Sequence, residues 1–289
     1  ASQSFITCWA MGVTQHEEAV ATIQDIINLH LLRGAIGRPG AGLCPVRGHS
    51  NVQGDRTMGI WEKMNPIFRE NLEREFDFTA PARDGLNTVE SIAAMRDGRA
   101  QVFFAMGGNF VAASPDTEVV SAALRNCGLT VQVVTKLNRT ALTPGRTSLI
   151  LPCLGRTEID RQASGEQFVS TESTMLNVQL SKGIFEPGSE YLRSEPWIVC
   201  NLAKAVLGRR SSVDWDAMYG DYDQIRESIS QVVPGCENYN ERIRVPGGFY
   251  MPNPANEGRF STPTGKAKFT TSTLRKVDLP PGKLILTTI

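Results

Sequence analysis

Apolar side chains recur at helical spacing near the start of the chain, between residues 15 and 33. Thr14 followed by Glu17 predicts a capping box at the beginning of this helix, and Gly34 predicts its end. His30 falls near the apolar side of the helix, so we expect it to be a structural histidine.

A second pattern, from residue 88 to residue 151, alternates helical stretches with short apolar runs. We expect one helix over 88–97 with Thr88 as its N-cap, and another that begins at Ser114. The apolar runs predict three strands, at 101–106, 129–135 and 148–151. Strand, helix and strand at this spacing predict a parallel sheet with right-handed crossovers.

Glycine and proline dominate residues 34–59, which hold seven glycines and two prolines in 26 positions. A loop of this length that also contains apolar residues is typical of an ordered functional loop. Part of 60–86 and the stretches 195–207 and 213–233 are expected to be helical, and 160–190 irregular or hairpin-like.

These patterns divide the chain into four parts. Residues 1–87 are expected to belong to a first α/β domain that carries the glycine-rich loop, and 88–210 to form a Rossmann-like α/β domain. Residues 211–283 are expected to be a helical and irregular wrap. The last residues, 284–289 (LILTTI), have the pattern of a buried strand and are interpreted as the start of a further domain.

The composition is that of a globular protein, with 41% hydrophobic and 21% charged residues in a chain of 289. Because 30 basic residues balance 30 acidic ones, binding to nucleic acid or to a membrane through overall basic charge is excluded. No apolar run reaches the roughly 18 residues of a membrane-spanning helix. The six cysteines have no zinc or iron–sulfur spacing, which favours free thiols in a cytoplasmic protein.

Polar or glycine-containing segments follow each of the three strands expected between 101 and 151. They are Gly107-Gly108-Asn109, Thr135-Lys136 and Pro152-Cys153. Because ligands bind outside the carboxyl ends of parallel strands, we expect the three segments to share one rim. Two glycines let a ligand approach the backbone, and the following helix offers N–H groups to a phosphate. A nucleotide-type site and a plain tight turn both fit, whereas the missing GxGxxG pattern disfavours a standard NAD site.

The segment PVRGHSNVQG, residues 45–54, holds the densest set of candidate binding side chains. Arg47 can form paired hydrogen bonds with a phosphate or carboxylate, and His49 can transfer a proton near neutral pH. Neutral hydrogen-bonding or flexible positions complete the set: Gly48, Ser50, Asn51 and Gln53. This set suits a polar ligand rich in oxygen and nitrogen, and a self-bonded surface loop is the alternative. No Ser–His–Asp, HExxH, P-loop or GxSxG motif is present, so neither a nucleophile nor a metal ligand is evident.

Several segments together resemble the molybdopterin oxidoreductases of the dimethyl sulfoxide reductase family, in the branch of the formate dehydrogenase-like alpha subunits. They are WAMGVTQH at 9–16, NLHLLRGAIGRPGAGLCPVRGHSNVQGDRTMG at 28–59, FAMGGNFVAASPD at 104–116 and the Leu151-Pro152 pair. The resemblance implies the parallel-sheet, Rossmann-like central α/β domains of such an enzyme, with an irregular C-terminal portion. Its first part is highly specific, and the stretch after Arg156 matches much more weakly.

The resemblance also implies a cofactor, molybdenum or tungsten held by two molybdopterin guanine dinucleotides, and two-electron redox of a small substrate. In such enzymes the metal-ligating residue and an iron–sulfur cluster lie upstream of the segments found here, and a C-terminal pterin-binding domain would begin near Leu284. The chain then looks like the central part of a longer enzyme and is expected to be inactive alone. The implied partners are a small-molecule substrate, such as formate or another small anion, and an electron-transfer partner of unknown identity, with no nucleic acid.

Residue roles follow from the same resemblance. Met11 and Gln15 match the MGxxQ positions that contact the pterin. Arg47 matches the arginine beside the metal, where it would orient an anionic substrate, and His49 stands where a glutamine is more frequent. The resemblance therefore makes Arg47 and His49 the candidate catalytic residues, with the rest of their loop binding cofactor.

The second half of the chain supplies further candidate contacts. Gly108 and Asn109 match the turn that meets the dinucleotide. Thr135 and Lys136 stand where many members have Ser-Asp or Gln-Asp. Glu195 matches an acidic position suited to guanine, whereas Glu158-Ile159 replaces a frequent Glu-Lys pair.

Two other functions compete with this interpretation. A non-catalytic nucleotide- or phosphate-binding α/β module fits the polar rim, and a molybdenum content near zero in the full-length protein would favour it. A NAD-dependent dehydrogenase would need the Rossmann fingerprint, which the sequence lacks.

Overall fold

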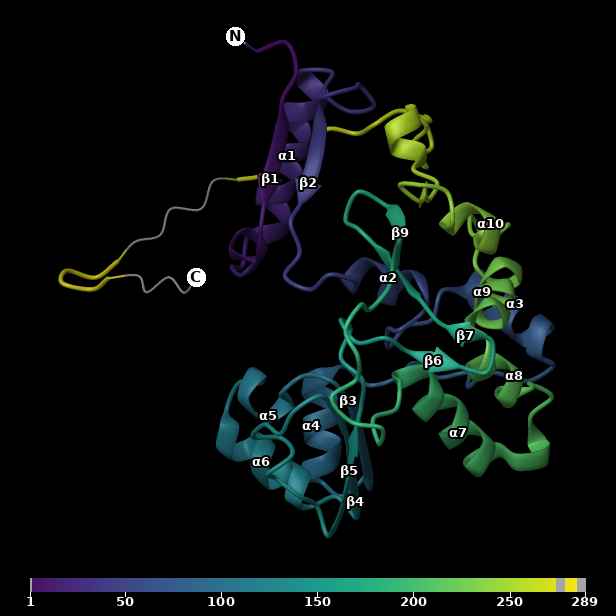
Figure 1. The fold of residues 1–289 in the computed structure, drawn as a ribbon. Helices are drawn as coiled ribbons and strands as arrows, with labels where there is room; N and C mark the ends of the chain where they lie inside the picture. Colours follow the sequence, from purple (N-terminus) through teal and green to yellow (C-terminus); the bar gives the residue numbers. More distant parts are fainter. Residues whose placement is uncertain (1, 274–278, 285–289) are drawn as a thin grey trace. The chain divides into compact units, whose positions relative to one another are not determined.

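The computed structural model describes residues 2–273 and 279–284, and its described parts form two compact units (Figure 1). Unit 1 consists of Ala1–Gly54, Thr171–Gln179 and the segment from Gly247 onward. Unit 2 consists of Asp55–Ser170 and Leu180–Pro246. Apart from Leu284, the strand expected at 284–289 lies outside the described residues.

Unit 1 is built on a strand–helix–strand arrangement of β1 (Ile6–Trp9), α1 (Ala19–Leu32) and β2 (Gly42–Pro45). The two strands pair in parallel, and α1 lies alongside them (Figure 1). His30 of α1 is fully buried, and its Nε2 atom lies 2.7 Å from the Thr7 hydroxyl. The prediction of a structural histidine is confirmed.

The helix α1 begins four residues later than the sequence predicts, at Ala19. Thr14 instead ends a short 3₁₀ helix, η1 (Met11–Thr14), where its hydroxyl donates to the Met11 carbonyl at 2.7 Å. The predicted capping box of Thr14 and Glu17 is wrong, because the threonine hydroxyl is used inside the preceding turn.

Five further elements that follow β2 lie wholly or partly in unit 1. The chain continues into α2 (Val52–Thr57) and returns through β8 (Val169–Glu172) and β9 (Asn177–Ser181). A short strand, β10 (Phe249–Tyr250), then pairs antiparallel with β9 and is followed by η3 (Pro254–Glu257).

Unit 2 contains a parallel sheet of β3 (Val102–Met106), β4 (Leu129–Val134) and β5 (Thr147–Pro152), with β4 in the centre. The three predicted strands and their parallel pairing are confirmed. Because β3, β4 and β5 run in one direction, the segments that follow them leave the sheet at the same edge.

Three helices lie on one side of this sheet: α4 (Thr88–Arg96), α5 (Phe110–Ala113) and α6 (Thr117–Arg125) (Figure 1). Their contacts with the sheet pass through Phe103, which packs on a set of buried side chains. That set is Met95, Val111, Val120, Ala123, Leu124 and Cys127. Full burial of one large aliphatic side chain stabilises a fold by roughly 1.5–3 kcal/mol, so this cluster contributes strongly to the stability of unit 2.

The caps of these helices differ from the sequence-based expectation. Asn87, rather than Thr88, caps α4 and forms a capping box with Glu90. Ser114 ends α5, because its N–H closes that helix on the Phe110 carbonyl at 3.0 Å. Asp116 therefore takes the N-cap of α6 and accepts from the Val119 N–H at 3.2 Å.

The remaining elements of unit 2 are mostly helical. They are α3 (Pro66–Phe76), β6 (Arg161–Gln162), β7 (Gly165–Glu166), α7 (Glu195–Leu207), η2 (Gly208–Arg210), α8 (Trp215–Gly220), α9 (Tyr222–Val232) and α10 (Tyr239–Ile243). The helix predicted at 195–207 is confirmed, and the one predicted at 213–233 is interrupted at Asp221, which caps α9. Among the described residues, no helix has the length and apolar character needed to cross a membrane.

Candidate functional site

The two segments singled out near the N-terminus meet at one edge of unit 1. Met11–Gln15 follows β1 and Arg47–Gln53 follows β2, so parallel pairing places both beyond carboxyl ends of neighbouring strands. The Val46 N–H extends this pairing by donating to the Trp9 carbonyl at 2.7 Å. The Met11 sulfur lies 4.0 Å from the position that a Cβ on residue 48 would occupy. We call these two segments the unit 1 edge.

Arg47 and His49 are both exposed on the unit 1 edge. One guanidinium nitrogen of Arg47, Nη2, donates to Gln53 Oε1 at 2.7 Å. Because a glutamine is neutral, this contact orients the guanidinium without cancelling its charge. The edge can therefore offer a positive, hydrogen-bonding group to an anion.

Asn51 has a structural contact within the same unit. Its side-chain oxygen accepts from the Glu172 N–H at 2.9 Å, which holds the loop against the returning segment 171–179. The same oxygen occupies the space that a side chain on Gly54 would need, so a larger residue there would displace the Asn51 amide. Asn51 thus fixes the shape of the loop that carries Arg47.

A second polar region follows the sheet of unit 2, and we call it the unit 2 rim. It comprises Gly107–Asn109 after β3, Thr135–Lys136 after β4 and Pro152–Cys153 after β5, and it brings all three predicted segments to one sheet edge. Gly107 and Gly108 have φ angles of +68° and +71°, a conformation that favours glycine. Leaving aside the adjoining residues of the chain, no atom of the described residues lies within 4 Å of where their Cβ atoms would be. A phosphate or a similar group could therefore come into contact with this backbone.

Asn109 holds the rim together through a loop whose role the sequence analysis did not identify. Its side-chain oxygen accepts from the Thr140 hydroxyl at 3.1 Å, and the Thr140 hydroxyl accepts from the Val111 N–H at 3.0 Å. Asn138 donates to the Gly108 carbonyl at 2.8 Å. Asn138 and Thr140 lie in a polar stretch after β4, where an Asn that turns the chain back on itself is a recognisable signal.

Glu195 lies close to the segment that follows β5, because the residues just before it are hydrogen-bonded to that segment. The Leu154 N–H donates to the Arg193 carbonyl at 3.0 Å, so residue 193 runs alongside the end of β5 and leads into Ser194 and Glu195. Partial removal from water, and secondarily the negative charge of Asp55, raise the pKa of Glu195. Because partial burial disfavours the ionised form of Glu195, N–H donors of a ligand would stabilise its carboxylate.

A buried chain of hydroxyl groups sets the start of α7, where Glu195 lies. Ser194 caps the helix by accepting from the Trp197 N–H at 3.3 Å. The Ser194 hydroxyl lies 2.7 Å from the hydroxyl of the buried Tyr222, which in turn donates to Asp160. Burial, followed by the hydrogen bond to Asp160, raises the pKa of Tyr222 far above its usual range.

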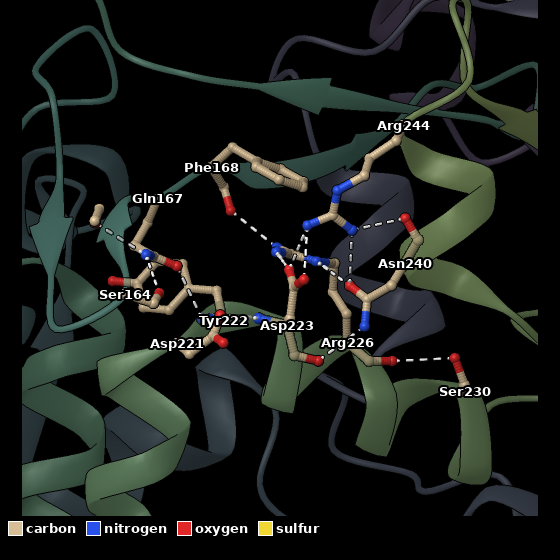
Figure 2. A network of polar contacts seen from close by, with 11 residues as sticks. Ser164, Gln167, Phe168, Asp221, Tyr222, Asp223, Arg226, Ser230, Asn240 and Arg244 are labelled. Atoms are coloured by element: carbon tan, nitrogen blue, oxygen red, sulfur yellow. Dashed lines mark hydrogen bonds and ion pairs between the residues drawn. The ribbon is translucent and has the colours of Figure 1, made fainter.

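A separate polar network joins α9 and α10 to the chain around Phe168 (Figure 2). The Arg226 side chain is 5% exposed, lies 3.9 Å from the Phe168 ring centre and pairs with Asp223. Arg244 also binds Asp223, at 2.6 Å, and lies over the same ring. This network contains none of the predicted site residues and stabilises the fold of unit 2.

Glu158 and Cys153 also have structural surroundings. The Glu158 carboxylate accepts from the Gly155 N–H at 2.5 Å and from the Gly188 N–H at 2.8 Å, and so closes a loop. Burial, with smaller contributions from the charges of Glu195 and Glu158, raises the pKa of Cys153 to about 11. A thiol with this pKa is protonated at neutral pH and does not act as a nucleophile. Within 2–273 and 279–284, no group of three or more His, Cys, Asp or Glu side chains could hold a metal.

A cavity of about 380 Å³ lies elsewhere in unit 2 and contains none of the predicted site residues. Its walls come from residues 56–68 and from Val233 and Pro234. The predicted site residues therefore lie at the carboxyl ends of the strands and not in this cavity.

The fold and these two regions define an α/β protein that presents polar, glycine-containing loops beyond the carboxyl ends of parallel strands, where such folds bind nucleotide-like ligands. The sequence profile of the molybdopterin oxidoreductase family matches residues 1–205. An uncharacterized oxidoreductase of Mycobacterium tuberculosis is 56% identical over 290 residues, which cover 100% of this chain and 37% of that protein. Protein YdeP of Escherichia coli is 46% identical over 272 residues, 94% of this chain and 36% of YdeP. A nitrate reductase of Klebsiella oxytoca is 29% identical over 254 residues, 84% of this chain and 27% of that enzyme.

The chain belongs to the molybdopterin oxidoreductase family. Membership implies a molybdenum–pterin cofactor. The chain spans little more than a third of the length of the mycobacterial and Escherichia coli relatives.

Proposed function

We propose that this chain forms the central cofactor-binding region of a formate dehydrogenase-like oxidoreductase that uses molybdenum bis(molybdopterin guanine dinucleotide). The observation that carries the proposal is the pairing of β1 with β2. It brings the Met11–Gln15 segment next to the Arg47–Gln53 segment, both of which resemble cofactor-contacting segments of that family.

The residues present fit such a cofactor. The Gly107 N–H donates to the Val133 carbonyl at 2.8 Å, but the open space above Gly107 and Gly108 leaves room for a phosphate of the dinucleotide to approach this backbone. Met11, Gln15 and Gly48 would contact the pterin at the unit 1 edge. When bound, the metal centre would supply two-electron redox chemistry.

The side chains of this chain would bind and orient the ligands. Arg47 would hold a small anionic substrate such as formate, since its guanidinium is oriented by Gln53 and keeps its charge. His49 would accept or donate a proton at one of its ring nitrogens. In the Rossmann-like unit 2, Glu195 would accept hydrogen bonds from the guanine, and Thr135 and Lys136 would contribute rim contacts.

Arg47→Ala in the full-length protein tests the substrate role. Turnover of the anionic substrate should fall by at least about tenfold, the loss expected for a charge-assisted hydrogen bond, while molybdenum content stays near the wild-type value. Arg33→Ala, at an exposed arginine of the same unit, is the matched control. Unchanged turnover in Arg47→Ala would refute the role, and His49→Gln then separates substrate choice from turnover.

Glu195→Gln tests the dinucleotide role without an activity assay. The amide keeps the size of the side chain but loses one acceptor, so the guanine nucleotide released from the denatured protein should fall relative to Glu190→Gln, a nearby exposed control. An unchanged guanine content would remove Glu195 from the site.

The remaining parts of the proposal concern the longer protein. An iron–sulfur cluster and the metal-ligating residue would lie outside this segment, which would make the segment inactive alone, and electrons would pass to an electron-transfer partner. Metal and nucleotide analysis of the purified full-length protein tests this directly. A protein with bound nucleotide and a molybdenum content near zero would favour the non-catalytic nucleotide-binding module.

A further inference from the structure

Two of the six cysteines face each other across the parallel pair of strands in unit 1. Cys8 of β1 and Cys44 of β2 are register partners. Partners on neighbouring strands lie about 4.7–4.9 Å apart and point to the same face of the sheet. A disulfide needs Cα atoms about 4.4–6.8 Å apart, so the backbone already meets this condition.

The two thiols are neighbours and are accessible, unlike the other four. Cys8 is exposed and Cys44 is partly exposed, whereas the remaining cysteines are buried. The Cys44 thiol interacts with the Cys8 thiol and with the Thr174 side chain. Partial burial, and then the neighbouring Cys8, raise the pKa of Cys44, while Thr174 acts in the opposite direction.

We propose that Cys8 and Cys44 are a modification site, at which a peroxide converts the two thiols into a reversible intramolecular disulfide.

The chemistry takes place in two steps. The exposed Cys8 thiolate attacks one oxygen of the peroxide, the O–O bond breaks, and hydroxide leaves and takes up a proton to become water. Cys8 is now a sulfenic acid. The Cys44 sulfur attacks the Cys8 sulfur, the S–O bond breaks as the S–S bond forms, and the second water carries away the Cys44 proton. Two electrons pass from the two thiols to one hydrogen peroxide, which yields two waters.

The Cys8–Cys44 disulfide would form next to the unit 1 edge. Cys8 lies three residues before Met11, and Cys44 lies three residues before Arg47. A covalent bond at this point ties together the two strands from which the unit 1 edge departs. The formation of the bond does not depend on the function proposed above, since it requires only the strand register and access for the oxidant.

The test is a thiol count on the native wild-type protein. The protein is treated with hydrogen peroxide, denatured, alkylated and digested, and its peptides are analysed by mass spectrometry. The expected result is a cross-linked pair of peptides carrying Cys8 and Cys44, 2 Da lighter than the two reduced peptides together. Dithiothreitol should restore both thiols, and Cys127, Cys153, Cys200 and Cys236 should remain reduced throughout.

Two variants separate the roles of the two thiols. Cys44→Ser should leave Cys8 as a sulfenic acid, so that dimedone labels Cys8 at least about tenfold more than in wild type. Cys153→Ser, at a buried cysteine, should leave the cross-link unchanged. Wild-type protein that keeps both thiols, or that gains oxygen on Cys8 without cross-linking to Cys44, would overturn the proposal even if a variant fails to fold.

Discussion

Units 1 and 2 both contain parallel strands followed by polar loops, but the strands of unit 1 are much less buried than the central strand of unit 2. None of the residues in β1 or β2 is fully buried, whereas all but the first residue of β4 are. Unit 2 also has the apolar cluster around Leu124, for which unit 1 has no counterpart among its described residues. The buried groups of unit 1 are largely polar or small, as His30 and Asn177 illustrate.

Similar loops at strand ends can therefore be held in place by different interactions, an apolar core in one unit and hydrogen bonds in the other. The unit 2 rim rests on an apolar core and on the Asn109–Thr140 hydrogen bonds. The unit 1 edge is held by strand pairing and by hydrogen bonds such as that between Asn51 and Glu172. Mutations should therefore act on unit 2 mainly through stability and on the unit 1 edge mainly through ligand binding.

The largest effect is expected from Leu124→Ala in the core of unit 2. Deleting a fully buried leucine side chain costs about 2–5 kcal/mol of unfolding free energy. Leu32→Ala, on the exposed side of α1 in unit 1, should change stability by no more than about 0.5 kcal/mol. Denaturant unfolding followed by tryptophan fluorescence measures both, and equal losses would contradict the contrast between the units.

Asp223→Asn should have the next largest effect, because it removes the charge that balances Arg226 and Arg244. Leaving the hydrogen bonds of a largely buried arginine unmet costs about 1–3 kcal/mol. Partial burial alone would raise the pKa of Asp223. The hydrogen bonds from Arg244 and Arg226 outweigh this effect, so the pKa of Asp223 is lowered.

The same pair of proteins gives a pH test. A carboxyl whose folded pKa is lowered stabilises the fold above its unfolded pKa of about 4, and this contribution is lost as the pH falls below that value and through the lower folded pKa. Wild type should therefore lose more stability than Asp223→Asn between about pH 5 and pH 3. Parallel pH profiles of the two proteins would show that Asp223 is not the group responsible.

Tyr222→Phe removes the hydroxyl that links Ser194 to Asp160 while keeping the ring. The expected loss is about 1–2 kcal/mol, since the partners of a buried hydroxyl are left unmet. Tyr191→Phe is the control, because Tyr191 is 74% exposed. Thermal unfolding of both variants measures the difference, and an equal melting temperature would remove Tyr222 from the support of α7.

Gly108→Ala should have the smallest effect on stability, about 1–2 kcal/mol or less, which is the cost of a left-handed backbone for a residue with a Cβ. Space is open at this position, so no clash adds to the strain. Guanine nucleotide content should nevertheless fall, because the methyl group covers the exposed backbone. A loss of stability without a loss of bound nucleotide would show that the unit 2 rim does not bind the dinucleotide.

The three strands of the unit 2 sheet and the longer helices could be predicted from the sequence because their apolar spacing is local, whereas β1 and β2 of unit 1 were not predicted. The runs before Met106, Val134 and Pro152 are short, apolar and punctuated by glycine or proline, so the parallel sheet of unit 2 followed directly. The caps at Thr14 and Ser114 were predicted wrongly. In both cases a neighbouring turn uses the residue, and this competition is not visible in the residue types alone.

The candidate site was only partly readable from the sequence. Strand order predicted that the three segments of the unit 2 rim lie together. The pairing of β1 with β2, which brings Met11 close to Gly48, was not predicted and is found only in the structure. The roles of Thr140 and of Tyr222 depend on contacts between residues 28 or more positions apart. The Cys8–Cys44 pair depends on strand register, which is set by pairing and not by spacing along the chain.

The three separated stretches that build unit 1 have a consequence for how the protein is made. The partner of Val178 in β9 is Phe249, which is translated 71 residues later. At roughly 5–20 residues per second, translation takes on the order of 4–14 s to pass from one to the other. During that interval β9 presents an edge that any other extended segment of the nascent chain could occupy.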